Sequence, residues 1–344
     1  DYEEVQELLQ KDAELFSAYY DVKPGGNWEE KSILRTGKPF EEFALDKEIP
    51  ETELRDLLER GKKNLWEERT KRIRPQLDDK VILGWNALMN AALSKAFAAT
   101  GEEKYRELAL RNMNFLLHAY EGEGPVLMHT WKNGQAKYPA FLDDYSFLIA
   151  ALLELAQVTA DYTHLQTASA LTEKVLELYS DEASPFFFFT YKGQKDIIVP
   201  KKEIYDGATP SGNAVMAGNL YRLSILFDKP AWRERAEDMV QSLGDVAVKY
   251  PTSFGVWLAL YYEMSMGTVE IAIVGKDAKK YLEKILRVYI SHKLAQASDN
   301  PLPGYPLLAD KAETSEILIY LCKNYACRRP VNTIQEFLSL LKHN

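Results

Sequence analysis

The sequence contains an internal repeat with helical spacing. Three pairs of residues mark it, and the members of each pair stand 20 residues apart: Trp85 and Tyr105, Tyr145 and Leu165, Gly212 and Trp232. Short connections with helix-stop and helix-start residues, such as Asp228-Lys229-Pro230, join the two helical patterns of each pair. Each pair therefore marks two consecutive helices joined by a short connection. Because such a repeated unit stacks on its neighbours, we predict three αα-hairpins.

The two helices of each predicted hairpin differ in character. The first carries apolar residues at steps of three and four, together with small residues such as Ala91, Ala151 and Ala217 that allow close helix packing. The second mixes Glu, Arg and Lys with a narrower apolar stripe. We therefore predict a buried inner layer made of the first helices and an outer layer made of the second.

Long segments lead from each outer helix back to the next inner helix. Residues 121–142 predict a β-hairpin around Asn133-Gly134, and residues 181–211 predict one in which Phe186 to Tyr191 pairs with Asp196 to Val199. Loops on a rigid scaffold are where function concentrates. The N-terminal face of the inner helices, where these segments arrive, is therefore the candidate site.

The remaining segments do not follow the hairpin pattern. Helices are predicted at 2–17, 52–69, 251–266, 277–290 and 333–342, strands at 269–274 and 316–321, and an irregular stretch from Asp21 to Pro50. The predicted class is all-α, built of helical hairpins with β-hairpin insertions and a small C-terminal α/β element. The predicted domains are a helical-hairpin portion at 1–266 and an α/β appendage at 267–344.

The composition is that of an acidic globular chain. Lys and Arg number 42 and Asp and Glu number 51, a formal charge of −9, and the apolar fraction is 46%. Without a long basic run, neither nucleic acid nor a membrane surface is predicted as a partner. Without a signal peptide or an 18-residue apolar span, a cytoplasmic location is expected.

Cysteine and histidine usage predicts no cofactor and no metal site. Cys322 and Cys327 are too few for a disulfide framework and have no second pair, so neither a zinc nor a redox centre is predicted. The 5 histidines show no ligand spacing.

Acidic residues recur just ahead of the inner helices. Asp78-Asp79, Asp143-Asp144 and Asp206 each stand close to the start of one such pattern, so the repeats bring carboxylates to one rim. An Asp at a helix start also caps free N–H groups, a contribution of about 0.5–2 kcal/mol, but capping does not explain the doublets. The polar and aromatic residues predicted to bind substrate there are Arg74, Trp85, Asn86, His129, Trp131, Tyr145, Tyr205, Ser211 and Asn213.

Carboxylates among aromatic side chains suit a carbohydrate, whose hydroxyl groups need acceptors and whose ring face packs on aromatic rings. Glycoside hydrolysis uses a pair of carboxyl groups, one as acid and one as base or nucleophile. We therefore name Asp79, Asp144 and Asp206 as catalytic candidates. Ser211 lacks a nucleophile elbow and is better interpreted as a helix N-cap.

Several motifs, in order along the chain, resemble one protein family. They are Gly26-Asn27-Trp28-Glu29, Arg72 to Lys80, Trp85 to Met89, Phe141 to Leu148, Tyr205 to Asn213 and Cys322 to Val331. They resemble the large C-terminal region of the thioredoxin-domain-containing proteins related to spermatogenesis-associated protein 20. The resemblance implies an (α/α)6 toroid similar to those of N-acylglucosamine 2-epimerases and six-hairpin glycosidases. It implies a fold rather than a particular reaction.

The sequence also departs from the family in extent. It begins with Asp1 in a helical pattern, after the motifs of the family's first hairpins and without its thioredoxin-like domain. We therefore expect the latter part of the toroid. Exposed inner-helix surface is then expected to be covered by the missing N-terminal segment or by self-association.

Two functions remain open on this evidence. In the first, the intact protein is a carbohydrate-acting enzyme, glycosidase-like or epimerase-like. Epimerases of this fold use histidines for proton transfer, and His129 alone is expected on the right face, which weakens that variant. In the second, the toroid is a non-catalytic binding or scaffold module that accompanies the thioredoxin-like domain.

Overall fold

The computed structural model describes residues 1–122, 124–313 and 316–342. The chain forms two compact units, Asp1–Asp78 and Asp79–Asn344, and each has its own cluster of buried apolar side chains. The predicted domain boundary at 266 and 267 falls inside the second unit, where the C-terminal strands and the hairpin helices share one core. That boundary remains a prediction about the chain's organisation.

The first unit is a small helical bundle. Its elements are α1 (Tyr2–Leu9), a 3-10 turn (Gln10–Asp12), α2 (Ala13–Tyr19), α3 (Phe40–Asp46) and α4 (Glu51–Thr70). The helix predicted at 2–17 is therefore interrupted at Gln10, whose φ is +47°. The helix α3 lies within the stretch predicted to be irregular. The unit packs tightly, since a Cβ at Gly61 of α4 would lie 2.5 Å from the Phe16 ring.

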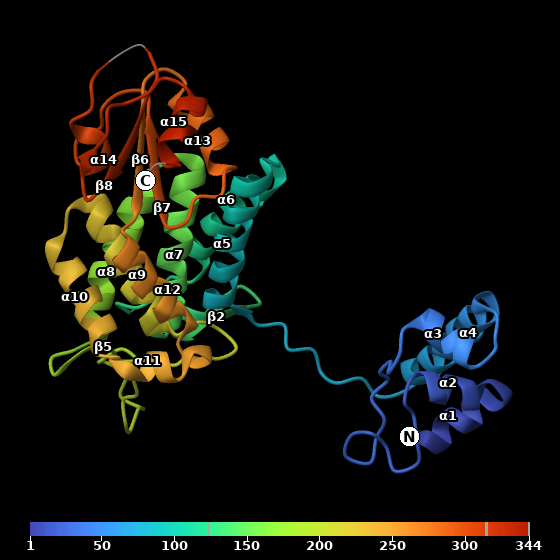
Figure 1. The fold of residues 1–344 in the computed structure, drawn as a ribbon. Helices are drawn as coiled ribbons and strands as arrows, with labels where there is room; N and C mark the ends of the chain where they lie inside the picture. Colours follow the sequence, from blue (N-terminus) through green and yellow to red (C-terminus); the bar gives the residue numbers. More distant parts are fainter. Residues whose placement is uncertain (123, 314–315, 343–344) are drawn as a thin grey trace. The chain divides into compact units, whose positions relative to one another are not determined.

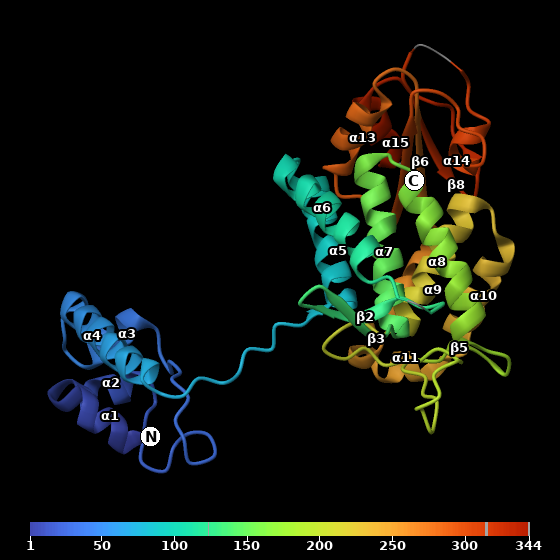
Figure 2. The same ribbon diagram turned by 180° about the vertical axis from the view of Figure 1, so that it is seen from behind.

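The three predicted hairpins are confirmed in the second unit. They are α5 (Leu83–Thr100) with α6 (Glu103–Ala119), α7 (Leu142–Thr159) with α8 (Thr163–Tyr179), and α9 (Gly212–Phe227) with α10 (Pro230–Gln241). Figures 1 and 2 show them from opposite sides. The short α11 (Asp245–Lys249) leads to α12 (Gly255–Met266), the inner-type helix predicted at 251–266. This is the helical-hairpin architecture expected for part of an (α/α)6 toroid.

The repeat is also visible in how the inner helices end. The residues that follow α5, α7 and α9 are Gly101, Ala160 and Asp228, and all three adopt the left-handed conformation, with φ of +72°, +51° and +51°. In each case the backbone N–H donates to a carbonyl four residues earlier, which satisfies one of the free acceptors at the helix end.

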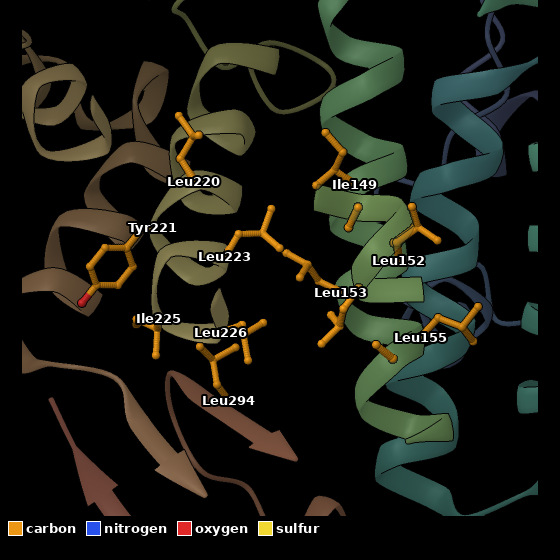
Figure 3. Packing of buried hydrophobic residues seen from close by; sticks show 14 of the residues in the cluster. Ile149, Leu152, Leu153, Leu155, Leu220, Tyr221, Leu223, Ile225, Leu226 and Leu294 are labelled. Carbon is orange, nitrogen blue, oxygen red and sulfur yellow. The ribbon is translucent and has the colours of Figure 1, made fainter. Parts of the chain in front are cut away.

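The core is centred on α7, which packs against α5 on one side and α9 on the other. Leucines of α7 and α9 point toward one another, among them Leu153 and Leu223 (Figure 3), and Leu294 of the C-terminal sheet lies beside the same cluster. A buried hydrogen bond also crosses this interface, from Asn219 Nδ2 to the Ser146 carbonyl, at 2.8 Å. This packing explains why the inner helices have apolar residues on nearly every face.

The first predicted β-hairpin is confirmed. The strands β2 (Met128–Lys132) and β3 (Gln135–Pro139) pair antiparallel, and β1 (Val81–Ile82) adds a third strand beside β2. Asn133 and Gly134 form the turn with φ of +51° and +78°, values that Asn and Gly tolerate best.

The second predicted β-hairpin was misplaced. The paired strands are β4 (Ser180–Asp181) and β5 (Ser184–Phe187), and residues 196–199 form no strand. Phe187 instead pairs with Ser180 of β4, and the Asn213 side chain accepts from the Phe187 N–H at 2.8 Å and donates to the Phe187 carbonyl at 3.0 Å. The main-chain groups of Phe187 are therefore already used, and Ile198 is 98% exposed.

The C-terminal α/β element is a four-stranded sheet in the order β7-β6-β8-β9. Its strands are β6 (Val269–Val274), β7 (Lys293–Ser298), β8 (Leu318–Lys323) and β9 (Ala326–Cys327), and its helices are α13 (Ala278–Leu286), α14 (Pro306–Ala309) and α15 (Ile334–Leu341). The strand predicted at 269–274 is confirmed, and the one predicted at 316–321 is found from Leu318. The parallel strand β7 was not predicted.

Figure 1 shows this sheet at one end of the inner helices and β2, β5 and α11 at the other. The N-terminal ends of the inner helices therefore lie at the end of the unit opposite the sheet. Among the helices of the described residues, none combines the length and the apolar character needed to cross a membrane.

Substituting Leu152 on α7 tests whether this helix forms the centre of the core. Its side chain is fully buried, whereas Leu110 on the outer helix α6 is 38% exposed. Leu152→Ala should lower the free energy of unfolding by about 2–5 kcal/mol, because it leaves a cavity, and Leu110→Ala should cost less than about 1 kcal/mol. Urea unfolding followed by circular dichroism measures both, and equal losses would contradict this account.

Candidate acid–base site at the inner-helix N-termini

Asp144 joins the starts of two inner helices. Its Oδ1 accepts from the Gly84 N–H of α5 at 2.9 Å, and its Oδ2 accepts from the Phe141 N–H just ahead of α7, also at 2.9 Å. The side chain is 2% exposed. These bonds satisfy N–H groups that have no partner within their own helices. Asp144 therefore acts as a cap shared between α5 and α7, and its carboxylate is committed to that role.

Asp143 lies between the starts of α7 and α9. The Gly212 N–H, at the first residue of α9, donates to its carboxylate, and a Cβ at position 212 would lie 2.1 Å from Asp143 Oδ1. Burial, followed by the nearby charges of Asp144 and Glu203, raises the pKa of Asp143 to about 7, against the opposing effects of Gly212 and His129. This carboxyl group therefore titrates near neutral pH, as a general acid or base requires.

His129, on β2, completes the cluster. Its Nδ1 lies 2.8 Å from Asp144 Oδ2, and its ring lies 4.8 Å from that of Phe141. The hydrogen bond to Asp144 raises the pKa of His129, burial opposes this, and the charge of Asp143 adds to the increase. Because Asp144 binds Nδ1, the other ring nitrogen is the one that can exchange a proton with a ligand.

Asp206 repeats the shared-cap arrangement one helix further along. Its Oδ1 accepts from the Ser211 N–H at 2.9 Å and its Oδ2 accepts from the Val256 N–H at the start of α12, at 2.8 Å. Ser211 is the N-cap of α9, as predicted, with its Oγ accepting from the Ala214 N–H. Asp206 thus ties the starts of α9 and α12 together, and both its oxygens are used in doing so.

Three of the predicted substrate-binding residues make structural contacts. Tyr145 is fully buried, and its hydroxyl accepts from the Leu127 N–H at 2.8 Å. Asn213, also fully buried, bonds the Phe187 main chain and donates to the Glu203 carbonyl at 3.0 Å. Asn86 donates to the Ile82 carbonyl at 3.0 Å.

The predicted aromatic residues divide into two kinds. Trp131 packs edge-on against Phe115, with ring centroids 5.4 Å apart, and is part of the core boundary. Trp85 and Tyr205 are each 63% exposed, and so is Tyr138 on β3. The exposed rings offer the flat apolar surfaces that a sugar ring needs, whereas Trp131 does not.

Asp79 does not join the His129 cluster. Asp79 is exposed and forms an ion pair with Lys132, and the hydrogen bond from that lysine lowers the pKa of the carboxyl group. A proton-donating role at neutral pH therefore has no support at Asp79. Arg74 belongs to the first unit, where its side chain is exposed.

The structure adds two carboxyl groups that the sequence reasoning did not select. Asp143 was noticed only as the neighbour of Asp144, and Glu203 was not singled out. The doublet was the available signal, because one Asp suffices to cap a helix and the second then requires another explanation. Within residues 1–122, 124–313 and 316–342, no group of three or more His, Cys, Asp or Glu side chains is placed to hold a metal ion.

Comparison with known proteins supports the resemblance seen in the motifs. No family model matches the chain. An uncharacterised protein of Caenorhabditis elegans is 28% identical over 370 residues, which cover 98% of this chain and 50% of that protein. Human spermatogenesis-associated protein 20 is 25% identical over 342 residues, which cover 92% of this chain and 43% of the human protein. The mouse protein of the same name is also 25% identical, over 338 residues.

The chain is a homologue of spermatogenesis-associated protein 20. It spans about half the length of the curated relatives it matches. Among solved structures, a family 105 glycoside hydrolase of C. acetobutylicum aligns with a TM-score of 0.39 and 15% identity, over 58% of this chain and 59% of that one. A likeness this distant supports no inference about function.

Gly212 tests the close approach of α7 and α9. A Cβ there would lie 2.1 Å from Asp143 Oδ1 and 3.1 Å from Asp143 Cα, whereas Gly255, at the start of α12, has nothing within 4 Å. Gly212→Ala should destabilise the protein by about 1–3 kcal/mol, because the helix must shift. Gly255→Ala should be neutral or stabilising by up to about 1 kcal/mol. Thermal unfolding measures both, and an equal response would contradict the proposed contact.

Asp143 also gives the stability of the chain a distinctive pH dependence. With its pKa raised from 3.8 to about 7, the folded chain keeps a proton that the unfolded chain releases. The stability contributed by this group is therefore lost as pH rises from about 4 to about 7. The free energy of unfolding of the wild type, minus that of Asp143→Asn, should therefore fall over this pH range.

Asp161 provides the control, because its pKa is lowered, first by the hydrogen bond from Thr163. Its contribution should instead be lost as pH falls below about 4. Urea unfolding between pH 3.5 and 8 measures both differences. A pH-independent difference for Asp143→Asn would show that the carboxyl group has an ordinary pKa.

Proposed function

We propose that the chain carries an acid–base site that acts on a carbohydrate, with Asp143 as the proton donor. The observation that supports this most strongly is the pKa of Asp143, raised to about 7 by burial beside Asp144 and Glu203. A carboxyl group that is partly protonated at neutral pH is what glycoside cleavage needs to protonate its leaving oxygen.

The neighbouring groups supply the rest of such a site. Glu203 is an exposed carboxylate close enough to raise the pKa of Asp143, which makes it the candidate for the second carboxylate of a hydrolytic pair. His129 is held by Asp144 with one ring nitrogen bonded and the other remaining for proton exchange. Asp144 and Asp206 are positioning residues in this scheme, because their oxygens bind main-chain N–H groups.

Carbohydrate is the substrate class that the surrounding side chains favour. Trp85, Tyr138 and Tyr205 are exposed aromatic residues on the segments that carry or precede the starts of the inner helices. Aromatic rings next to carboxyl groups suit a ligand with an apolar ring face and many hydroxyl groups. The motif resemblance to the six-hairpin glycosidase and epimerase folds points to the same class.

A binding or scaffold module is the second candidate function. It is favoured by the number of rim residues whose polar atoms are used internally, namely Asp144, Tyr145, Asp206, Ser211 and Asn213. A rim built chiefly to hold helix starts together needs no turnover. In this case the exposed edges of the inner layer are expected to bind the remainder of a longer chain or a second copy.

Asp143→Asn separates the two candidates. The full chain would be incubated with a panel of 4-nitrophenyl glycosides, and the same sugars would be tested for thermal stabilisation. We expect turnover by the wild type with an alkaline limb near pH 7 and a loss of at least about 100-fold in kcat/KM for Asp143→Asn, because general acid catalysis contributes about 10²–10⁴-fold.

The matched control is Asp161→Asn, at the opposite end of α7, which should retain full activity. Binding of a sugar that is unchanged in Asp143→Asn, without turnover by either protein, would favour the binding module. The absence of both turnover and stabilisation by any sugar would count against a carbohydrate ligand.

A further inference from the structure

The two cysteines form a disulfide bond in a β-hairpin of the C-terminal sheet. Cys322 on β8 and Cys327 on β9 stand directly opposite each other, with Asn324 and Tyr325 in the turn. Both turn residues have positive φ, +50° and +61°, as a two-residue hairpin turn requires. The spacing of the two cysteines predicts no role for them. The disulfide closes a loop of only a few residues, so it constrains the unfolded chain little.

The hairpin is held in place without the disulfide. Oε2 of the buried Glu270, on β6, accepts from the Tyr325 N–H at 3.0 Å. The Tyr325 hydroxyl donates to carbonyls at the end of α9, Ser224 at 3.2 Å and Ile225 at 3.0 Å. The turn is therefore anchored at both its backbone and its side chain by contacts that do not involve the S–S bond.

The two sulfur atoms lie in different surroundings. Cys322 is 2% exposed, whereas Cys327 lies on the exposed strand β9. Lys311 Nζ lies 3.3 Å from Cys327 Sγ and 5.0 Å from the centre of the Tyr320 ring. Burial lowers the pKa of Lys311, and the charges of Asp310 and Glu270 oppose that effect. An ammonium group next to a sulfur stabilises the thiolate form, the reactive form in thiol chemistry.

We propose that Cys322 and Cys327 form a thiol–disulfide exchange site, in which a dithiol reductant attacks Cys327 and Lys311 stabilises the thiolate that results. An incoming thiolate bonds to Cys327 Sγ, the S–S bond breaks, and Cys322 leaves with the electron pair and takes a proton. The second thiol of the reductant then attacks the sulfur that the reductant has bonded to Cys327. This releases Cys327 as a thiolate beside Lys311, and the dithiol is oxidised as the cysteine pair is reduced.

Exposure and positive charge bring an incoming thiolate to Cys327. Lys311 faces the sulfur directly, Arg328 follows it in the chain, and the nearby carboxylates Asp310 and Glu270 act on Lys311. Glu270 already accepts from the turn, so its charge is partly satisfied there. The buried Cys322 is the leaving group, and the exposed Cys327 is the sulfur that a reductant can reach.

The first test measures the thiol pKa of Cys327 in a Cys322→Ser chain, from the rate of iodoacetamide alkylation against pH. We expect a pKa at least about one unit below the ordinary value of ~8.5. Adding Lys311→Gln should raise it and slow alkylation at pH 7 about fivefold or more, the change in thiolate fraction that one pKa unit gives. Lys311→Arg should preserve the low value because it retains the charge.

The matched control is Lys284→Gln, which removes an exposed lysine that also lies over a tyrosine ring, at 5.7 Å from the centre of Tyr281. It should leave the alkylation rate unchanged. An ordinary pKa for Cys327, or equal rates with and without Lys311, would overturn the proposal.

The second test uses the unsubstituted chain, so it does not depend on how the variants fold. Dithiothreitol at pH 7 should reduce the disulfide completely while the circular dichroism spectrum and melting temperature stay nearly unchanged, as shown by thiol labelling and mass spectrometry. Reduction that occurs only after the chain unfolds, or that unfolds it, would assign the disulfide a purely structural role and overturn the proposal.

Discussion

The N-terminal ends of the inner helices are held together by carboxylates that cross from one helix start to the next. Asp144 bonds the start of α5 from the start of α7, Asp143 bonds the start of α9, and Asp206 joins α9 to α12. Each bond satisfies an N–H that its own helix leaves free and places a negative charge at the positive end of a helix dipole. The first role of these carboxylates is therefore structural, because they hold the helix starts together. Any acid–base chemistry at the rim depends on polar groups whose hydrogen-bonding capacity is not fully used in this way.

Asp143 is the carboxyl group of the rim with the most unusual environment. Asp144 accepts from the Gly84 and Phe141 N–H groups and is bonded to His129, so both its oxygens have partners. Asp143 is bonded by Gly212 and lies beside the charge of Asp144, so ionising it is costly. Burial, followed by the adjacent charge of Asp144, thus raises the pKa of Asp143 to about 7, the range in which a general acid works.

Periodicity predicted the hairpins and the rim because both depend on spacing along the chain. Apolar steps of three and four mark the inner helices, and the Asp residues stand close to the starts of these helices. The second β-hairpin and the roles of single rim residues depend on partners distant in sequence. Asn213 takes the main-chain bonds of Phe187, and Gly212 binds Asp143 from 69 residues away along the chain (212 − 143). Neither partner is visible in a local pattern, so the sequence indicated the rim of helix starts but did not select Asp143 within it.

The surroundings of the Cys322–Cys327 pair, at the opposite end of the inner helices, also depend on residues distant in sequence. The spacing of Cys322 and Cys327 carries no metal or redox signature, yet the β8–β9 turn brings the two sulfur atoms together and the chain before β8 brings Lys311 to one of them. In both places a buried carboxylate, Asp144 or Glu270, satisfies backbone N–H groups and fixes a segment. Beside each lies the group that the proposals concern, Asp143 with its raised pKa and Cys327 in contact with Lys311. At each end of the second unit, a hydrogen-bonded carboxylate thus fixes the backbone next to the residue for which we propose a chemical role.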